Sequence, residues 1–214
     1  QGLAAVWAES NDRESIMAAF KRREVYATTG PRISLRFFGG WNFTPGDMNS
    51  SDYANIGYTK GVPMGGDLMK GNQGDVPGFL ISAARDPIGA NLDRVQVVKG
   101  WLDAEGKSQE KVFNVAWAGD RQPDTAGKLP AIGNTVNQAT AAVSNSIGTD
   151  ELSTLWVDPE FDASVRAFYY IRALQIPTAR HSLYDAIALQ VTETDRGAKT
   201  IQERAYSSPI WYTP

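Results

Sequence analysis

The stretch Val165–Leu174 constrains the fold most, because it is the clearest β-strand signal in the chain. Its side chains alternate between a set that includes Arg166 and Phe168 and a set that includes Ala167 and Tyr169. Successive side chains of a strand point to opposite faces, so this pattern predicts a half-buried strand. A strand of this kind needs strands beside it and a layer that covers its apolar face.

Further short segments, rich in Val, Ile, Phe and Trp and bounded by turn residues, also predict strands. The polar segments 42–77 and 119–150 predict loops, the first with a short strand near Gly65–Leu68. The other predicted strands are Glu24–Thr28, an alternating stretch through Ile33, Leu35 and Phe37, Phe79–Ala84, Arg94–Leu102, Lys111–Trp117, Gln202–Tyr206 and Ile210–Tyr212.

One helix is predicted over Asp12–Arg23. Asn11 is its expected N-cap, and Glu14 three residues later completes a pattern that resembles a capping box. A second, short helix is predicted over Ser182–Leu189. The first helix is amphipathic, and its apolar face needs a covering surface. That face consists of Ile16, Met17 and Phe20.

The order of elements is one helix followed by many short strands at irregular spacing, with long loops between them. This order predicts a mainly β chain that forms an antiparallel β-sandwich with an N-terminal helix. A mixed α+β domain is the alternative.

Composition narrows the class of protein. The 214 residues suffice for a core that buries roughly 70% of the unfolded surface. The net charge of −3 argues against nucleic-acid binding and against a polybasic membrane contact. No apolar run approaches the length of a transmembrane helix. The absence of cysteine excludes thiol chemistry and leaves the compartment open, so a periplasmic or secreted location is compatible with it.

The first residues, Gln1–Trp7, contain neither an initiator methionine nor the basic segment of a signal peptide. We therefore interpret this start as a cut edge, with further chain before it.

Catalysis through histidine would have to use His181, the only histidine. Its neighbours form no nucleophile motif, and a surface or loop position is the favoured interpretation. The glycine-rich segment Gly61–Asp67 lacks the P-loop pattern and predicts a bend into a strand.

Two groups of side chains are candidates for a Ca²⁺ or Mg²⁺ site, since these cations prefer oxygen ligands. Asp158 and Asp162 form one group. Asp86, Asn91 and Asp93 form the other. Neither has EF-hand spacing, and turn capping by Asp and Asn is the favoured interpretation of both.

The segment Tyr26–Arg32 is the best local candidate for a binding site. Thr28, Thr29 and Arg32 surround a Gly-Pro break just after the predicted helix. Two hydroxyls and a guanidinium can hydrogen-bond an anionic ligand. A tight corner at a domain junction is the competing interpretation.

The aromatic residues allow a carbohydrate-binding face, although most aromatics in a β-sandwich pack in the core. An exposed, coplanar pair of tryptophan rings would favour sugar binding. The tryptophans considered are Trp41, Trp101, Trp117, Trp156 and Trp211.

Long stretches of the chain resemble one bacterial family. Gly2–Glu9, the following helix and Tyr26–Ile33 look like the end of a PHP-type metal-dependent phosphoesterase domain. The remainder is similar to the C-terminal region of the family called domain of unknown function 3604. The similar stretches are Arg36–Trp41, Gly57–Leu68, Asp86–Trp101, Ala167–Arg180 and Thr200–Pro214.

This resemblance implies that residues 1–30 are the edge of a PHP-like catalytic domain and that residues 31–214 form an accessory β-sandwich. The His- and Asp-rich metal motifs of such a domain do not occur here, so the divalent metal and the catalysis would belong to the preceding domain. The chain is then expected to be a non-catalytic module of a metal-dependent hydrolase, with that domain as its partner. A carbohydrate-binding module or a homodimer is the alternative.

Overall fold

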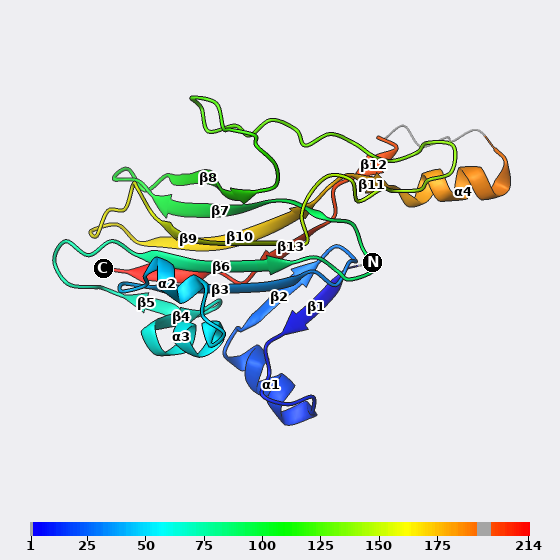
Figure 1. Cartoon of the computed structure of the whole chain (residues 1–214). Coiled ribbons are helices and arrows are strands. Elements are labelled where there is room, and N and C mark those ends of the chain that lie inside the picture. The colour runs from blue at the N-terminus through cyan, green and yellow to red at the C-terminus, as the bar shows by residue number, and fades with distance from the viewer. Residues whose placement is uncertain (1, 192–197) are drawn as a thin grey trace.

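The computed structural model describes residues 2–191 and 198–214. Gln1, the first residue of the start interpreted above as a cut edge, lies outside the described residues. Two β-sheets pack face to face, with helices at their margins (Figure 1). The helices are α1 (Arg13–Lys21), α2 (Pro45–Met48), α3 (Tyr53–Lys60) and α4 (His181–Leu189). The strands are β1 (Leu3–Val6), β2 (Val25–Thr28), β3 (Ser34–Gly40), β4 (Gly61–Pro63), β5 (Asp67–Met69), β6 (Gly78–Ala84), β7 (Leu92–Leu102), β8 (Ser108–Trp117), β9 (Glu151–Val157), β10 (Ala167–Gln175), β11 (Thr178–Ala179), β12 (Thr200–Ile201), β13 (Arg204–Ser207) and β14 (Ile210–Thr213).

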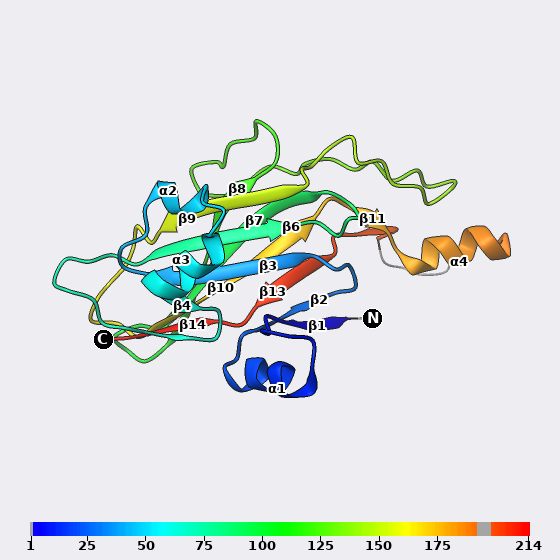
Figure 2. The ribbon, with the colours of Figure 1, turned by 60° about the horizontal axis from the view of Figure 1, so that its bottom comes forward.

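The larger sheet, sheet A, has eight strands arranged around β10. β7 and then β8 lie on one side of β10, and β13 and β14 share its other side. Beyond β13 the sheet continues through β2 to β1, as Figure 2 shows, and beyond β14 it continues to β5. All these pairs are antiparallel except β14 with β5, which is parallel.

The smaller sheet, sheet B, has the order β4-β3-β6-β9 and is antiparallel throughout. Its inner face meets sheet A through aromatic rings. The ring centroid of Phe79 on β6 lies 4.6 Å from the ring centroid of Tyr169 on β10 and 5.4 Å from that of Phe37 on β3. The predicted mainly β sandwich is confirmed, with the β14–β5 pair as its one departure from antiparallel order among the paired strands described.

The strand predicted at Val165–Leu174 is the centre of the molecule. In β10, Ala167, Tyr169 and Ile171 are buried, while Phe168 and Tyr170 on the opposite face are partly exposed. This is the burial pattern that the alternation predicts.

The first helix is shorter than predicted, and its N-cap is Asp12 rather than Asn11. The carboxylate of Asp12 accepts a hydrogen bond of 2.8 Å from the backbone N–H of Ser15, which satisfies an orphan donor of the first turn. The helix ends at Lys21 because Arg23 adopts a left-handed conformation with φ of 62°.

The segment 42–77 is not mostly loop, because it contains α2 and α3. The polar composition of this segment and its weak helical periodicity did not indicate α3. This helix packs on the ring of Phe38 through Gly57, where a Cβ atom would lie 2.6 Å from the ring. Five strands were also missed: β9, which begins directly after the second predicted loop, and the short strands β1, β4, β11 and β12. The other strand predictions and the helix at 182–189 are confirmed within one to three residues.

Residues 1–30 do not stand apart from the rest of the chain. β2 pairs with β13 through Thr28 opposite Ala205, so sheet A crosses the predicted boundary at residue 30. The division into two domains stays a prediction. No helix in the described part of the chain is long and apolar enough to cross a membrane.

A buried ion pair joins the two sheets. Lys99 on β7 donates a 2.6 Å hydrogen bond to Asp158, which follows β9, and a 2.7 Å bond to the carbonyl of Glu160. The hydroxyl of Tyr169 on β10 donates to the same carboxylate at 2.8 Å. Asp158 is 1% exposed, so both charges depend on these partners for solvation. Burial, and then the charge of Asp158, raise the pKa of Tyr169 far above its ordinary value, so its phenol stays a donor.

We predict that Asp158→Ala lowers the free energy of unfolding by about 3–5 kcal/mol, because it leaves the Lys99 ammonium buried without its counterion. Asp162→Ala is the matched control, because Asp162 is exposed and its loss should change stability far less. Urea unfolding of both variants measures the difference. Equal losses would contradict a dominant role of the buried pair.

Candidate functional site

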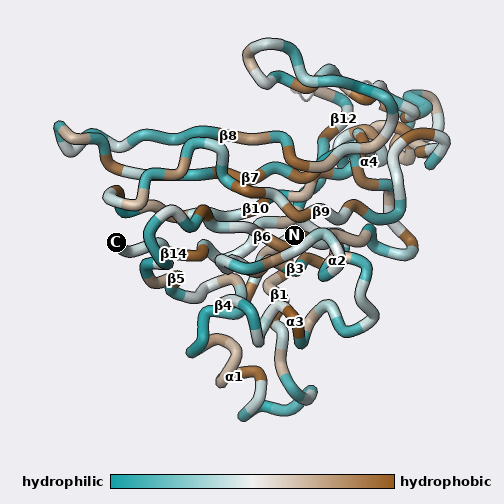
Figure 3. Tube along the Cα trace, turned by 60° about the vertical axis from the view of Figure 1, so that its left-hand side comes forward, coloured by the Kyte–Doolittle hydropathy of each residue, from teal (hydrophilic) through white to brown (hydrophobic). Residues whose placement is uncertain are grey.

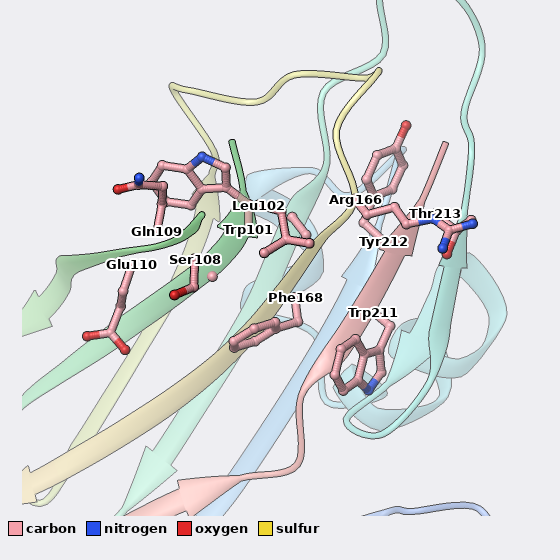
Figure 4. Close-up of a pocket in the computed structure, with 12 residues that line it drawn as sticks. Trp101, Leu102, Ser108, Gln109, Glu110, Arg166, Phe168, Trp211, Tyr212 and Thr213 are labelled. Atoms are coloured by element: carbon pink, nitrogen blue, oxygen red, sulfur yellow. The ribbon is translucent and has the colours of Figure 1, made fainter. Parts of the chain in front are cut away.

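A groove of about 570 Å³ lies at one end of the outer face of sheet A, the face turned away from sheet B (Figure 4). Its walls come from β7, β8, β10 and β14. The groove is lined by Gly100, Trp101, Leu102, Ser108, Gln109, Glu110, Arg166, Ala167, Phe168, Trp211, Tyr212 and Thr213.

Strand register explains why residues distant in sequence meet in this groove. Glu110 on β8 opposes Gly100 on β7, and Gly100 opposes Phe168 on β10. Phe168 in turn opposes Trp211 on β14. Residues that oppose one another point to the same face, so these four form a row across the sheet.

A second row lies beside the first, nearer the ends of the strands. Leu102 opposes Ser108 across the β7–β8 hairpin. Arg166 and Thr213 each lie one residue beyond the inward-facing pair of Ala167 and Tyr212, so alternation places them on the outer face. This row places the guanidinium of Arg166 and the hydroxyls of Ser108 and Thr213 beside the aromatic rings of the first row.

Two aromatic rings form the apolar part of the groove. The ring centroids of Phe168 and Trp211 are 5.3 Å apart, and their planes are inclined by 50°. Trp211 is 43% exposed, which is high for a residue of this size in a strand. The ring of Tyr170, the next outward residue of β10, is nearly parallel to that of Phe168 at 12°. An exposed aromatic surface of this kind typically marks a binding site.

Gly100 gives the Phe168 ring its position. A Cβ atom at Gly100 would lie 2.3 Å from Cζ of Phe168, so the ring occupies the space that any other side chain would fill. The hairpin beside it is fixed by Asp103, whose carboxylate accepts hydrogen bonds from the backbone N–H groups of Glu105 and Lys107. Gly106 supplies the positive φ of 76° that this turn needs.

The polar side chains of the groove are available to a ligand. The side chains of Glu110 and Arg166 are exposed, and neither side chain makes a hydrogen bond or ion pair with another residue in the described part of the chain. Gln109 opposes Trp101 in the β7–β8 pairing, so its side chain points to the inner face, where its amide N–H donates to Asp103 at 2.7 Å. The groove thus combines apolar rings with a free carboxylate and a free guanidinium.

The lining of the groove includes one carboxylate and one tyrosine. Glu110 is the one carboxylate among the lining residues, whereas hydrolysis of a glycosidic bond requires a pair. Tyr212 supplies no base, because burial and then the charge of Asp162 raise its pKa. Its hydroxyl donates to the carbonyl of Ala163 at 2.9 Å.

The predicted binding residues near the Gly-Pro break lie elsewhere, where β2 meets β13. Thr28 is buried, and its hydroxyl accepts a hydrogen bond from the N–H of Gly30 at 3.2 Å. The Thr29 hydroxyl accepts from the N–H of Arg204 at 2.9 Å. Arg32 is exposed, and its backbone N–H donates to Asp86 at 2.8 Å. Both hydroxyls thus have backbone partners, and ligand binding by these residues stays a prediction.

The candidate cation ligands take part in turns and ion pairs. Asp158 binds Lys99, and Asp162 accepts from the backbone N–H of Ser164. Asp93 lies between the guanidinium groups of Arg94 and Arg121, at 2.9 and 2.7 Å. Among the residues that the structure describes, no group of three or more His, Cys, Asp or Glu side chains could hold a metal ion.

Asp86 and Asn91 hold the turn between β6 and β7. Asp86 accepts from the backbone N–H of Ile88, and the Asn91 amide donates to the carbonyl of Ile147 at 2.9 Å. The turn-capping interpretation therefore describes what these side chains do. His181 is exposed at the first turn of α4, as the surface interpretation predicts.

Sequence reasoning identified one half of the aromatic pair. Trp211 was a candidate for a sugar-binding face, and it is exposed, whereas Trp41, Trp101, Trp117 and Trp156 are partly buried. Its partner is Phe168, not a second tryptophan, and the two rings are not coplanar. The alternation in β10 predicts that Phe168 points outward. It does not reveal which strand lies beside β10, and so it could not pair Phe168 with Trp211.

Together the fold and the groove define a β-sandwich with a ligand-sized groove on one sheet. The chain belongs to the family described as Protein of unknown function (DUF3604), whose family model matches residues 1–214. No curated protein and no solved structure matches the chain. The family predicted from the sequence is thereby confirmed.

We predict that Gly100→Ala displaces the Phe168 ring and lowers the free energy of unfolding by about 1–3 kcal/mol, because the new methyl group overlaps the ring. Gly46→Ala is the control, since the nearest atom to its Cβ is 3.8 Å away. Aromatic NMR shifts report the ring, and thermal unfolding reports stability. An unmoved Phe168 signal in Gly100→Ala would contradict the prediction.

Proposed function

We propose that this chain is a non-catalytic carbohydrate-binding module and that the groove on sheet A is its binding site. The observation that carries the proposal is the neighbouring pair of Phe168 and Trp211, with the uncommitted side chains of Glu110 and Arg166 beside it. Ligand sites in proteins combine such apolar surface with a few oriented polar groups.

The chemistry of a sugar ring matches these two components. One face of a pyranose presents C–H groups, which pack against an aromatic ring, while its edge presents hydroxyls. A carboxylate such as Glu110 accepts from two vicinal hydroxyls, and a guanidinium such as Arg166 donates to ring and hydroxyl oxygens. Rings inclined by 50° fit a twisted soluble chain better than the flat surface of a crystalline polymer.

We predict that Trp211→Ala and Phe168→Ala each weaken binding of the recognised oligosaccharide at least about tenfold, or about 1.4 kcal/mol, because each removes one stacking surface. Isothermal titration against a panel of soluble oligosaccharides measures this. Tyr184→Ala is the control, because Tyr184 is an exposed aromatic residue on α4, outside the groove.

Two results would count against sugar binding in the groove. One is a panel in which the wild-type chain binds nothing while it adsorbs to insoluble cellulose. The other is a sugar that binds equally well to wild type and to both groove variants.

We also propose, as a second function that is compatible with the first, that the chain is an accessory module of a metal-dependent hydrolase of the PHP type. The supporting observation is the outer face of α1, where Met17 is 48% and Phe20 is 45% exposed. Figure 3 shows hydrophobic positions along α1, which lies away from the packed strands. The proposed occupant of this face is the PHP-like domain that the family resemblance implies.

We predict that the purified chain hydrolyses no p-nitrophenyl phosphate above the uncatalysed rate with Zn²⁺, Mn²⁺ or Mg²⁺ added, because its described residues offer no metal-ligand group. A colorimetric assay measures this, and a characterised phosphatase serves as positive control. Metal-dependent turnover that persists through two further purification steps would contradict a non-catalytic role.

A further inference from the structure

A second cleft, of about 580 Å³, lies on the opposite side of the sandwich from the groove. It is bounded by the segment that follows β1, by the turn between α1 and β2, and by the outer face of sheet B. Its central residues are Trp7, Arg22, Glu24, Arg36 and Tyr58. None of them lines the groove on sheet A.

Arg36 is held in a fixed orientation by Trp7. Its guanidinium carbon lies 3.5 Å from the centre of the indole ring, a close cation–π contact. The indole is itself anchored, because its N–H donates to the carbonyl of Leu35 at 2.9 Å. A guanidinium fixed in this way is organised in advance for an oxyanion, since its donors form a planar fork.

The carboxylate of Glu24 makes no direct contact with Arg36 and has other partners. Glu24 is 2% exposed, and Arg22 donates to it at 3.2 Å. The Tyr58 hydroxyl also donates to Glu24, in a very short hydrogen bond. Burial, and then this hydrogen bond and the charge of Glu24, raise the pKa of Tyr58, so its hydroxyl keeps the proton that it donates.

Arg36 therefore makes no direct ion pair. One of its N–H groups donates to the Tyr58 oxygen at 3.4 Å. Within the described part of the chain, no carboxylate lies within 4.0 Å of its guanidinium. Buried or half-buried guanidinium groups in clefts usually have an anionic partner, so the missing partner indicates a ligand.

We propose that this cleft binds a small molecule carrying one oxyanion group, a carboxylate or a phosphate, which Arg36 holds through paired hydrogen bonds. The charges around the cleft decide between one anionic group and several. The two arginines and two glutamates of the lining, Arg22, Arg36, Glu9 and Glu24, sum to zero net charge, so a polyanion would meet repulsion from Glu9 at the rim. The rings of Trp7 and Pro63 fit the apolar remainder of such a ligand.

The test titrates the whole chain with benzoate and with phenyl phosphate, two probes that share the oxyanion and an apolar ring. The indole N–H signal of Trp7 in ¹H–¹⁵N NMR spectra reports occupancy beside Arg36. Arg36→Gln is expected to weaken binding of the preferred probe at least about tenfold, and Arg36→Lys to restore it only in part, because an ammonium lacks the planar fork.

Arg13→Gln is the matched control, since Arg13 is an exposed arginine on α1 outside the cleft. It should leave binding unchanged, while Glu9→Gln should tighten it by removing the charge at the rim. Circular dichroism checks that each variant is folded. No saturable shift of the Trp7 signal in wild type, or equal binding by folded Arg36→Gln, would overturn the proposal without affecting that for the groove on sheet A.

Discussion

The buried contact among Lys99, Asp158 and Tyr169 is the interaction on which the rest of the structure depends. It joins β7 and β10 of one sheet to the end of β9 in the other, at a point where both charges are removed from water. The net free energy of such a pair is small, because desolvation offsets most of the Coulomb attraction. Its effect is on geometry: a carboxylate with two donors and a turn N–H tolerates few arrangements of the two sheets.

This contact also positions the groove on the other face of sheet A. Lys99 precedes Gly100 on β7, and Tyr169 follows Phe168 on β10, so each inward-facing partner adjoins an outward-facing groove residue. Successive strand residues point to opposite faces. The contact between Lys99 and Tyr169 on the inner face therefore also fixes the register of Gly100 with Phe168 on the outer face. A one-residue slip would place Phe168 over a residue with a Cβ atom, and the ring could not lie where it does.

Patterns within one strand predicted the fold well, since alternation located β10 and β-rich composition located most of its neighbours. They failed where the determining contact is non-local. Asp158 follows a strand in a turn-like sequence and was considered as a metal ligand, although Lys99 and Tyr169 occupy it. The aromatic pair could not be predicted for the same reason, because Phe168 and Trp211 meet through the register of β10 with β14. Weak helical patterning concealed α3, which is stabilised by packing of Gly57 on Phe38.

The two proposed sites differ in what they require of the N-terminal segment. The groove is formed by strands from the middle and end of the chain, whereas the second cleft exists because Trp7 and Glu24 are carried to Arg36 by β1, α1 and β2. That segment is anchored from both sides, by the pairing of β2 with β13 in sheet A and by the Trp7 hydrogen bond to Leu35 in sheet B. The second cleft therefore depends on contacts of the N-terminal segment with both sheets, whereas the groove depends on the register of β7, β8, β10 and β14.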